Sequence, residues 1–137
     1  GLLRVVNPGA RRIETFTAEG DLLGHWGKAS ADIDGFFGCC NPADFTVLPD
    51  GRFVTAEKGI PRVKIYGAKG DLECVVADPQ MLGQTVSAAQ LNEDSGHTPT
   101  FDVAVDSLGR VLVLDPIKRQ VRVFVPLDGL TSTAKES

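Results

Sequence analysis

The sequence predicts an all-β protein made of repeated antiparallel sheets. One stretch of the chain recurs 58 residues further on without a gap, and internal repeats of this size are typical of stacked structural units. Within each copy apolar and polar residues alternate, as Val63 and Ile65 do with Arg62 and Lys64, which is the two-residue period of a half-buried strand. No segment has helical periodicity over three turns.

The repeat is clearest when residues 44–57 are placed above residues 102–115. The matching positions are Asp44 with Asp102, Gly51 with Gly109, Glu57 with Asp115, and residues 62–66 with 120–124. A partial third copy lies earlier at a shift of 50 residues, where Arg12 matches Arg62 and the run Gly20-Asp21-Leu22 matches Gly70-Asp71-Leu72. We expect structural roles within the repeat for the recurring positions Arg12, Asp44, Gly51, Arg62, Asp102 and Gly109.

Each copy divides into short strands at turn-forming sequences. Pro49–Gly51, Ala68–Gly70 and Ser107–Gly109 each end on a glycine that can adopt positive φ. The expected strands are 2–6, 11–16, 21–26, 44–48, 52–56, 62–66, 72–77, 102–105, 110–114 and 120–124. Four short antiparallel strands per repeat are typical of a β-propeller blade. The expected units are an incomplete blade at 2–27, a blade at 43–77, an insertion at 78–99, a blade at 100–126 and a polar tail at 127–137.

The aligned residues resemble the NHL-repeat family of β-propellers over about residues 2–77 and 100–125. The matching features are Asn41-Pro42 before an apolar strand, the turn Pro49-Asp50-Gly51, the acidic Glu57, the segment Arg62-Val-Lys-Ile-Tyr66 and the pair Trp26-Gly27. The resemblance implies a non-catalytic scaffold for recognition of a protein, peptide or glycan. It also implies a bacterial exported protein.

About eleven short strands are too few to close a ring of four to eight blades. An open arc leaves apolar sheet faces at both ends, and the sequence has no polar cap to cover them. We expect a second copy of the chain to complete a six-bladed ring, or further blades of a longer chain to do so; a stable monomeric arc is the third alternative. No signal peptide is recognisable, and Gly1–Val6 resembles the middle of a strand, so we expect the native chain to begin earlier.

Composition narrows the possible partners. Fourteen basic against 18 acidic side chains give a formal net charge of −4, whereas nucleic-acid-binding surfaces normally show a basic excess. No apolar stretch approaches the roughly 18 residues needed to cross a bilayer. We therefore expect neither nucleic-acid binding nor a membrane span.

Antiparallel alternation should place the longer loops on one face of the arc and the tight turns on the other, and the longer loops usually carry binding residues. The candidates on that face are Cys39, Cys40, Glu57, Lys58, His97, Asp115 and Lys118. Three interpretations of Cys39-Cys40 are open: two small buried groups, a vicinal disulfide, or weak candidate ligands of a soft metal ion. Apart from that possible metal ion, no cofactor is expected.

Glu57 and Asp115 occupy the same place in their repeats, as Asn7 does in the first copy. They could form a ring of acidic groups around a channel, or each could accept hydrogen bonds within its own blade, for instance from Arg62. Recurrence favours the second interpretation, because a catalytic residue need occur only once.

The leading functional hypothesis is therefore a recognition scaffold. The alternative is a redox or metal-dependent module that uses Cys39 and Cys40, or a lyase or hydrolase propeller once the ring is complete. A purely structural segment of a multidomain protein is the third possibility.

Overall fold

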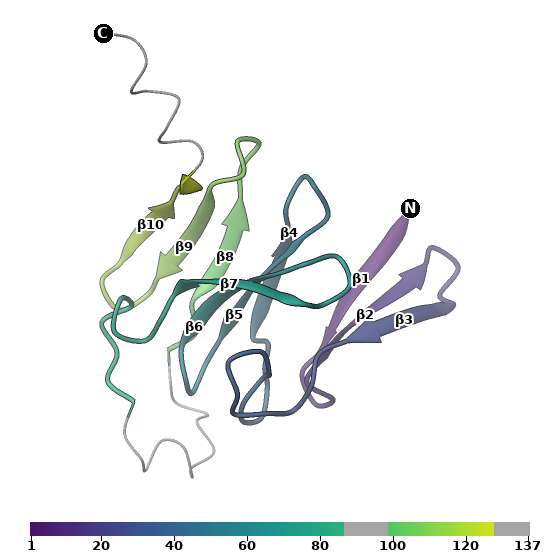
Figure 1. Ribbon diagram of the computed structural model, residues 1–137, viewed down its shortest axis with the longest axis horizontal. Coiled ribbons are helices and arrows are strands. Elements are labelled where there is room, and N and C mark those ends of the chain that lie inside the picture. The colour runs from purple at the N-terminus through teal and green to yellow at the C-terminus, as the bar shows by residue number, and fades with distance from the viewer. Residues whose placement is uncertain (87–98, 128–137) are drawn as a thin grey trace, which may run out of the picture.

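The structure, a computed structural model, describes residues 1–86 and 99–127. In these residues the chain forms ten strands in three separate antiparallel sheets, with no helix. The sheets follow one another along the chain and stand side by side as an open arc (Figure 1). The all-β expectation is confirmed. No described helix is long and apolar enough to cross a membrane.

Each sheet is a simple up-and-down succession of strands. Sheet 1 contains β1 (Leu2–Asn7), β2 (Arg12–Thr17) and β3 (Leu22–Trp26). Sheet 2 contains β4 (Asp44–Val47), β5 (Phe53–Glu57), β6 (Arg62–Tyr66) and β7 (Leu72–Ala77). Sheet 3 contains β8 (Asp102–Val105), β9 (Val111–Asp115) and β10 (Gln120–Phe124). The strand ends lie within one residue of those expected from the sequence.

The sequence repeat is also a repeat of strand register. Glu57 pairs with Arg62 between β5 and β6, and the same pairing recurs 58 residues later as Asp115 with Gln120. In sheet 1 it recurs 50 residues earlier, as Asn7 with Arg12. The residue shifts found in the sequence therefore relate positions that are structurally equivalent.

Equivalent turns close the first hairpins of sheets 2 and 3. The amide of Gly51 donates to the carbonyl of Leu48 at 2.9 Å, and the amide of Gly109 donates to that of Asp106 at 3.0 Å. Both glycines have positive φ, 90° and 74°, which costs a side-chain-bearing residue free energy. This requirement explains why glycine recurs at the two positions.

Two apolar clusters lie between the sheets. Sheets 2 and 3 share the larger one, formed mainly by Val54, Ala56, Val63, Leu82, Phe101, Val103, Val111 and Val113. Sheets 1 and 2, with the connection between them, share the second, whose buried members are Ile13, Phe36, Phe53 and Tyr66. Sheet 2 is thus covered on both faces. The expectation of a half-buried strand at 62–66 is wrong, because Arg62 and Lys64 are as buried as the apolar Val63.

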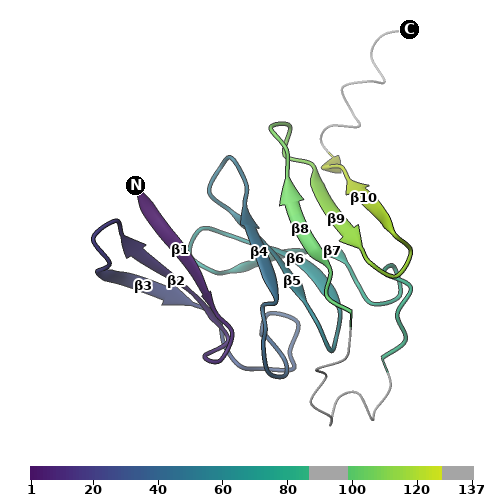
Figure 2. The ribbon, with the colours of Figure 1, turned by 180° about the vertical axis from the view of Figure 1, so that it is seen from behind.

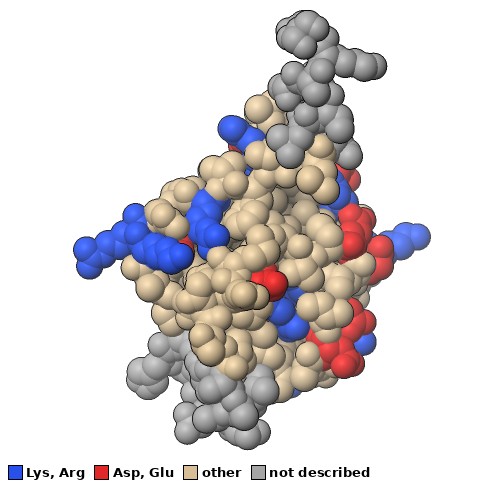
Figure 3. Space-filling view, turned by 60° about the vertical axis from the view of Figure 1, so that its left-hand side comes forward, with Lys and Arg blue, Asp and Glu red and all other residues tan. Residues whose placement is uncertain are grey.

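The outer faces of the arc are apolar and exposed. On sheet 3 these side chains include Leu114, Val121 and Val123, and on sheet 1 they include Leu3 and Val5, each 44–56% exposed. Residues without charge make up most of the molecular surface on the side shown in Figure 3.

Candidate functional site

The connections after β1, β3, β5 and β9, together with residues 78–86 after β7, lie at one end of the sheets (Figure 1) and are called the loop face below. The tight turns after β4 and β8 lie at the opposite end, as antiparallel alternation requires. The loop face carries the candidates Cys39, Cys40, Lys58 and Lys118, while Glu57 and Asp115 end the strands that lead into it. His97 lies outside the described residues.

The connection between β3 and β4, residues 27–43, folds back on itself. The amide of Phe36 donates to the carbonyl of Lys28 at 2.8 Å, and the amide of Ser30 donates to the carbonyl of Phe36 at 3.3 Å. The turn between them requires glycine at position 35, because a Cβ there would lie 2.5 Å from the Cβ of Ser30. The fully buried ring of Phe36 anchors this folded segment between sheets 1 and 2.

Three buried charged side chains, Glu57, Arg62 and Lys64, lie under this connection and are called the buried ion cluster. Arg62 Nη2 is 2.8 Å from Glu57 Oε2, and Lys64 Nζ is 2.7 Å from Glu57 Oε1. All three side chains are at most 5% exposed. Burial of a charge is tolerated when it is paired and hydrogen-bonded, so Glu57 allows both cations to enter the core. The ion pair expected between Glu57 and Arg62 is present.

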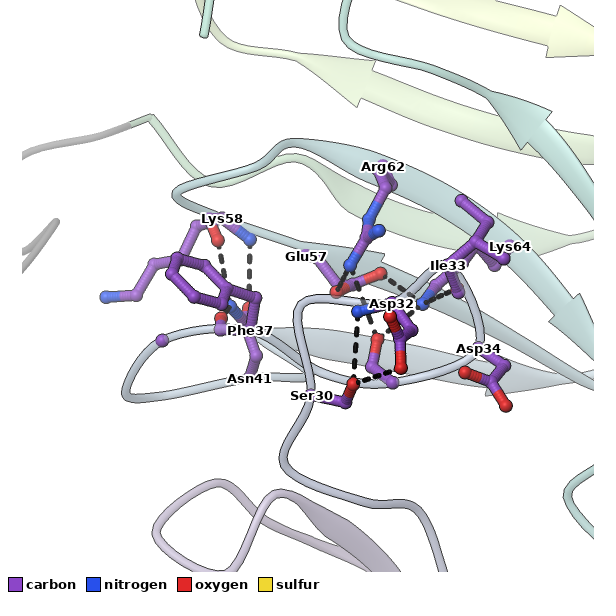
Figure 4. Close-up of polar contacts among 12 residues, drawn as sticks. Ser30, Asp32, Ile33, Asp34, Phe37, Asn41, Glu57, Lys58, Arg62 and Lys64 are labelled. Carbon is purple, nitrogen blue, oxygen red and sulfur yellow. Dashed lines mark hydrogen bonds and ion pairs between the residues drawn. The ribbon is translucent and has the colours of Figure 1, made fainter. Parts of the chain in front are cut away.

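The cluster also binds the connection between β3 and β4 (Figure 4). Lys64 Nζ donates to the carbonyls of Ile33 and Gly35, both at 2.9 Å. Arg62 Nη2 donates to the carbonyl of Gly35 at 3.3 Å, and the hydroxyl of Tyr66 donates to that of Asp34 at 3.3 Å. Buried side chains of β6 therefore hold the backbone of residues 33–35 in place.

Lys64 lies in unusual surroundings for a lysine. Its ammonium is 5.0 Å from the ring centre of Phe36 and 5.1 Å from that of Tyr66, within range of cation–π attraction. Burial lowers the pKa of Lys64 to about 8, although the charge of Glu57 acts in the opposite direction. Burial also raises the pKa of the Tyr66 hydroxyl. The sequence interpretation named Arg62 as a structural residue but missed Lys64; its only signal was a cation in a strand that is otherwise mostly apolar.

Asn41 fixes the second half of the connection. Its side-chain nitrogen donates to the carbonyls of Phe37 and Lys58, at 2.6 and 2.8 Å, and its oxygen accepts from the amide of Lys58 at 2.9 Å. Arg11 Nε donates to the carbonyl of Gly38 at 2.7 Å. The loop after β1, residues 27–43 and the start of the loop after β5 are therefore joined into one surface.

The interpretation of Cys39 and Cys40 as small buried groups is wrong. Both side chains are exposed, with no disulfide between them. The buried position is taken by Asn41, which is 0% exposed. The reason is chemical. The carbonyls of Phe37 and Lys58 need a hydrogen-bond donor and the amide of Lys58 needs an acceptor, and a thiol is weak in both roles.

We expect all three thiols to react with Ellman's reagent without denaturant, because Cys39, Cys40 and Cys74 are all exposed. Cys74 should react most slowly, since partial burial raises its pKa and the thiolate is the reactive form. In Cys74→Ser the slow phase should disappear. If fewer than two thiols react rapidly before reduction, Cys39 and Cys40 are joined as a vicinal disulfide in solution.

The equivalent positions Asn7, Glu57 and Asp115 do not share one role. Asp115 is fully buried, and its Oδ1 accepts from the amides of Ile117 and Lys118 at 3.0 and 2.9 Å. Asn7 likewise accepts from the amide of Ala10 at 3.1 Å. Asn7 and Asp115 thus each bind their own loop, whereas Glu57 pairs with Arg62 and Lys64. The buried carboxylates of Glu57 and Asp115 do not form a solvent-facing acidic ring. Lys118 itself is exposed.

The other recurring positions have separate tasks. Asp44 Oδ2 accepts from the amide of Val103 at 2.8 Å and so joins sheet 2 to sheet 3. Asp102, its counterpart, is exposed at the end of the arc. Arg12 pairs with Glu14 of its own strand at 2.7 Å, in contrast to Arg62, which pairs with the preceding strand.

Described residues line two hollows on the loop face. One, of about 310 Å³, lies between Arg11 and the connection and is lined by Arg11, Ala29, Ser30, Ala31, Phe36, Phe37 and Gly38. The other, of about 220 Å³, lies between the three sheets and is lined by Val6, Pro8, Cys40, Pro42, Ala43, Lys58 and Thr100. Lys58 is the only charged side chain among the residues that line the second hollow.

In residues 1–86 and 99–127, no three His, Cys, Asp or Glu side chains are grouped so that they could hold a metal ion. No protein-family model matches the chain. No curated protein matches it either.

Proposed function

We propose that the three sheets are consecutive blades of an NHL-type β-propeller. Their equivalent registers support this, as do the contacts from each sheet to the next. Between sheets 1 and 2, Trp26 packs so closely on Gly70 that a Cβ at position 70 would lie 2.5 Å from the Trp26 side chain. Between sheets 2 and 3, Asp44 makes the hydrogen bond to Val103 described above.

The arc needs a further sheet on each side. Ala56, Val63 and Ile65 pack against sheet 3, and their counterparts 58 residues later are the exposed Leu114, Val121 and Val123. At the other end, Gly20 is the counterpart of Gly70, and a Cβ on Gly20 would have nothing within 4 Å. A second copy of the chain or further blades of a longer chain would cover these positions.

The loop face is then the recognition surface for a protein, peptide or glycan. The observation that carries this proposal is the buried ion cluster, whose cations donate hydrogen bonds to the backbone of residues 33–35 and hold it in place. A site that is held rigid before its ligand arrives avoids part of the entropic cost of binding. Charged groups that are buried against the backbone are not available for chemistry on a substrate.

Selection of displayed peptides on the immobilised chain, with a glycan array in parallel, tests this function. Binders should lose at least tenfold in affinity for Ala31→Trp, which fills the 310 Å³ hollow. They should keep their affinity for Lys69→Trp, because Lys69 is also exposed but lies in the turn at the opposite end. If no ligand class is selected, or if the binders respond to the Lys69 variant alone, the loop face is not the recognition surface.

A further inference from the structure

The hollow of about 310 Å³ on the loop face combines apolar walls with a single charge. It lies where the loop after β1 meets the connection between β3 and β4, at one end of the sheets (Figure 2). Its walls include the exposed Ala29 and Ala31 and the half-buried ring of Phe37. Arg11 is the only charged residue among those that line it. Mostly apolar walls with a few polar groups are typical of ligand sites.

The guanidinium of Arg11 is oriented but keeps donors for a ligand. Its Nε donates to the carbonyl of Gly38 at 2.7 Å. Among the described residues, neither of its Nη nitrogens has a hydrogen-bond partner or an ion pair. The parallel N–H groups of a guanidinium match the two oxygens of a carboxylate. Arg11 can therefore bind a carboxylate without giving up its bond to Gly38.

The position of Arg11 in the repeat shows that the turn itself does not require an arginine. The same position is Pro61 in the second copy and Arg119 in the third. Arg11 and Arg119 have nearly the same positive φ, 53° and 52°, but Arg119 is not among the residues that line the hollow. The backbone conformation is thus shared, whereas a guanidinium at this hollow is particular to the first copy.

The acidic residues of the connection do not take up the charge of Arg11. Asp34 pairs with Lys28 at 2.8 Å. Asp32 Oδ2 accepts from the hydroxyl of Ser30 at 2.9 Å. Neither aspartate is among the residues that line the hollow. A ligand that enters the hollow therefore meets one positive charge on its wall.

The walls of the hollow are fixed by contacts within the chain. The buried ion cluster holds residues 33–35, and Asn41 binds the carbonyl of Phe37 at 2.6 Å. Together with the bond from Arg11 to Gly38, these contacts hold both sides of the hollow. A preformed site of this kind loses little conformational entropy when a ligand binds.

We propose that the hollow binds an acidic peptide, with a carboxylate on the guanidinium of Arg11 and an adjacent apolar side chain against Phe37. This inference rests on the function proposed for the loop face and names its ligand. A single guanidinium suits a singly charged carboxylate, whereas phosphorylated motifs are recognised by clusters of arginines. A volume of about 310 Å³ is at the lower end for ligand pockets, so the hollow takes a short extended segment.

Titration of the whole chain with three synthetic peptides, followed by NMR of the backbone amides, tests the proposal. Acetyl-Leu-Asp-Leu-amide carries its carboxylate on a side chain, and acetyl-Leu-Asn-Leu with a free C-terminus carries it at the chain end. Acetyl-Leu-Asn-Leu-amide has none. We expect the amides of Ala31 and Gly38 to shift with at least one of the first two peptides, which distinguishes the two sources of the carboxylate. The uncharged peptide should bind about tenfold more weakly, because hydrogen bonds to a charged acceptor are lost.

Substitutions in the chain test the role of Arg11. Arg11→Gln should weaken binding of the charged peptide about tenfold, to the level of the uncharged one. Arg11→Lys should restore only part of the affinity, because an ammonium keeps the charge but lacks the planar fork. Arg119→Gln is the matched control, since it removes an exposed arginine from the equivalent backbone position. It should leave the affinity unchanged.

Several results would overturn the proposal, and they can be told apart from failure of the proposed function. Equal binding of the charged and uncharged peptides, or equal losses in Arg11→Gln and Arg119→Gln, would exclude carboxylate recognition by Arg11. If such peptides still lose affinity for Ala31→Trp, the loop face remains a recognition surface and only the ligand class is wrong. Tighter binding of a sulfated disaccharide than of either charged peptide would assign the hollow to an acidic glycan instead. The absence of any shift at millimolar peptide would also overturn the proposal, and the display selection described above then decides the function separately.

Discussion

Glu57→Gln is expected to lower the free energy of unfolding by about 3–5 kcal/mol, the range found when one partner of a buried ion pair is removed. The substitution keeps the size of the side chain but leaves Arg62 and Lys64 buried without a counter-charge. Chemical denaturation at pH 7 measures the loss. The amides of Gly35 and Phe36 should also exchange faster, because the cluster holds this part of the connection in place.

The loss should depend on pH in a defined direction. The pKa of Lys64 is about 8 in the folded chain and 10.5 in the absence of burial. Between about pH 8 and pH 10.5 the unfolded chain binds more protons than the folded chain, so the free energy of unfolding rises with pH in this range. Glu57→Gln removes a charge that raises the pKa of Lys64, so this window starts at lower pH in the variant. The difference between the two proteins should therefore be largest below about pH 8 and smaller at pH 9, where Lys64 is mostly neutral in both.

A matched control is available in the same sheet. Asp50 Oδ2 lies 2.8 Å from Arg52 Nη2, the same distance as in the pair of Glu57 and Arg62. The side chains of Arg52 and Asp50, however, are 40% and 55% exposed. Asp50→Asn should cost no more than about 1 kcal/mol, as is usual for ion pairs in solvent. Comparable losses in the two variants would show that the buried ion cluster does not stabilise the fold in the way proposed.

The strands could be predicted from the sequence because their signals are local. Alternation and turn glycines determine where a strand begins and ends, and the recurring Gly51 and Gly109 mark the same turn twice. Burial of Arg62 and Lys64 has no such signal. A cation in an alternating strand normally faces solvent, and here it is covered by residues 33–35, which lie about 30 positions earlier in the chain.

The exposure of Cys39 and Cys40 was unpredictable for a similar reason. A cysteine is often buried, and the sequence does not say which residue of the run 38–41 turns inward. Asn41 is the residue that turns inward because backbone groups of Phe37 and Lys58 need hydrogen-bond partners at that point. Phe37 and Lys58 lie on separate segments of the chain. This requirement exists only once the loops after β3 and β5 have come together.

Gly70→Ala is expected to destabilise the chain by about 2–5 kcal/mol, the sum of two costs. Gly70 has a φ of 88°, and positive φ costs a residue with a side chain roughly 1–2 kcal/mol. In addition, the new Cβ would lie 2.5 Å from Cβ and Cγ of Trp26, and overpacking of this kind typically costs about 1–3 kcal/mol. Chemical denaturation of the variant measures the total.

The repeat supplies a control in which only one of these costs applies. Gly20, the counterpart of Gly70, has a φ of 98° but open space around its Cβ position, so Gly20→Ala should lose only the roughly 1–2 kcal/mol of backbone strain. In a Trp26→Gly background the steric cost disappears, because residue 26 then has neither a Cβ nor an indole, and the two alanine variants should then differ little. Equal losses in the original chain would mean that Trp26 does not pack on this turn in solution. A difference that disappears together with the Trp26 side chain would instead measure the steric contact between positions 26 and 70, which lie on sheets 1 and 2.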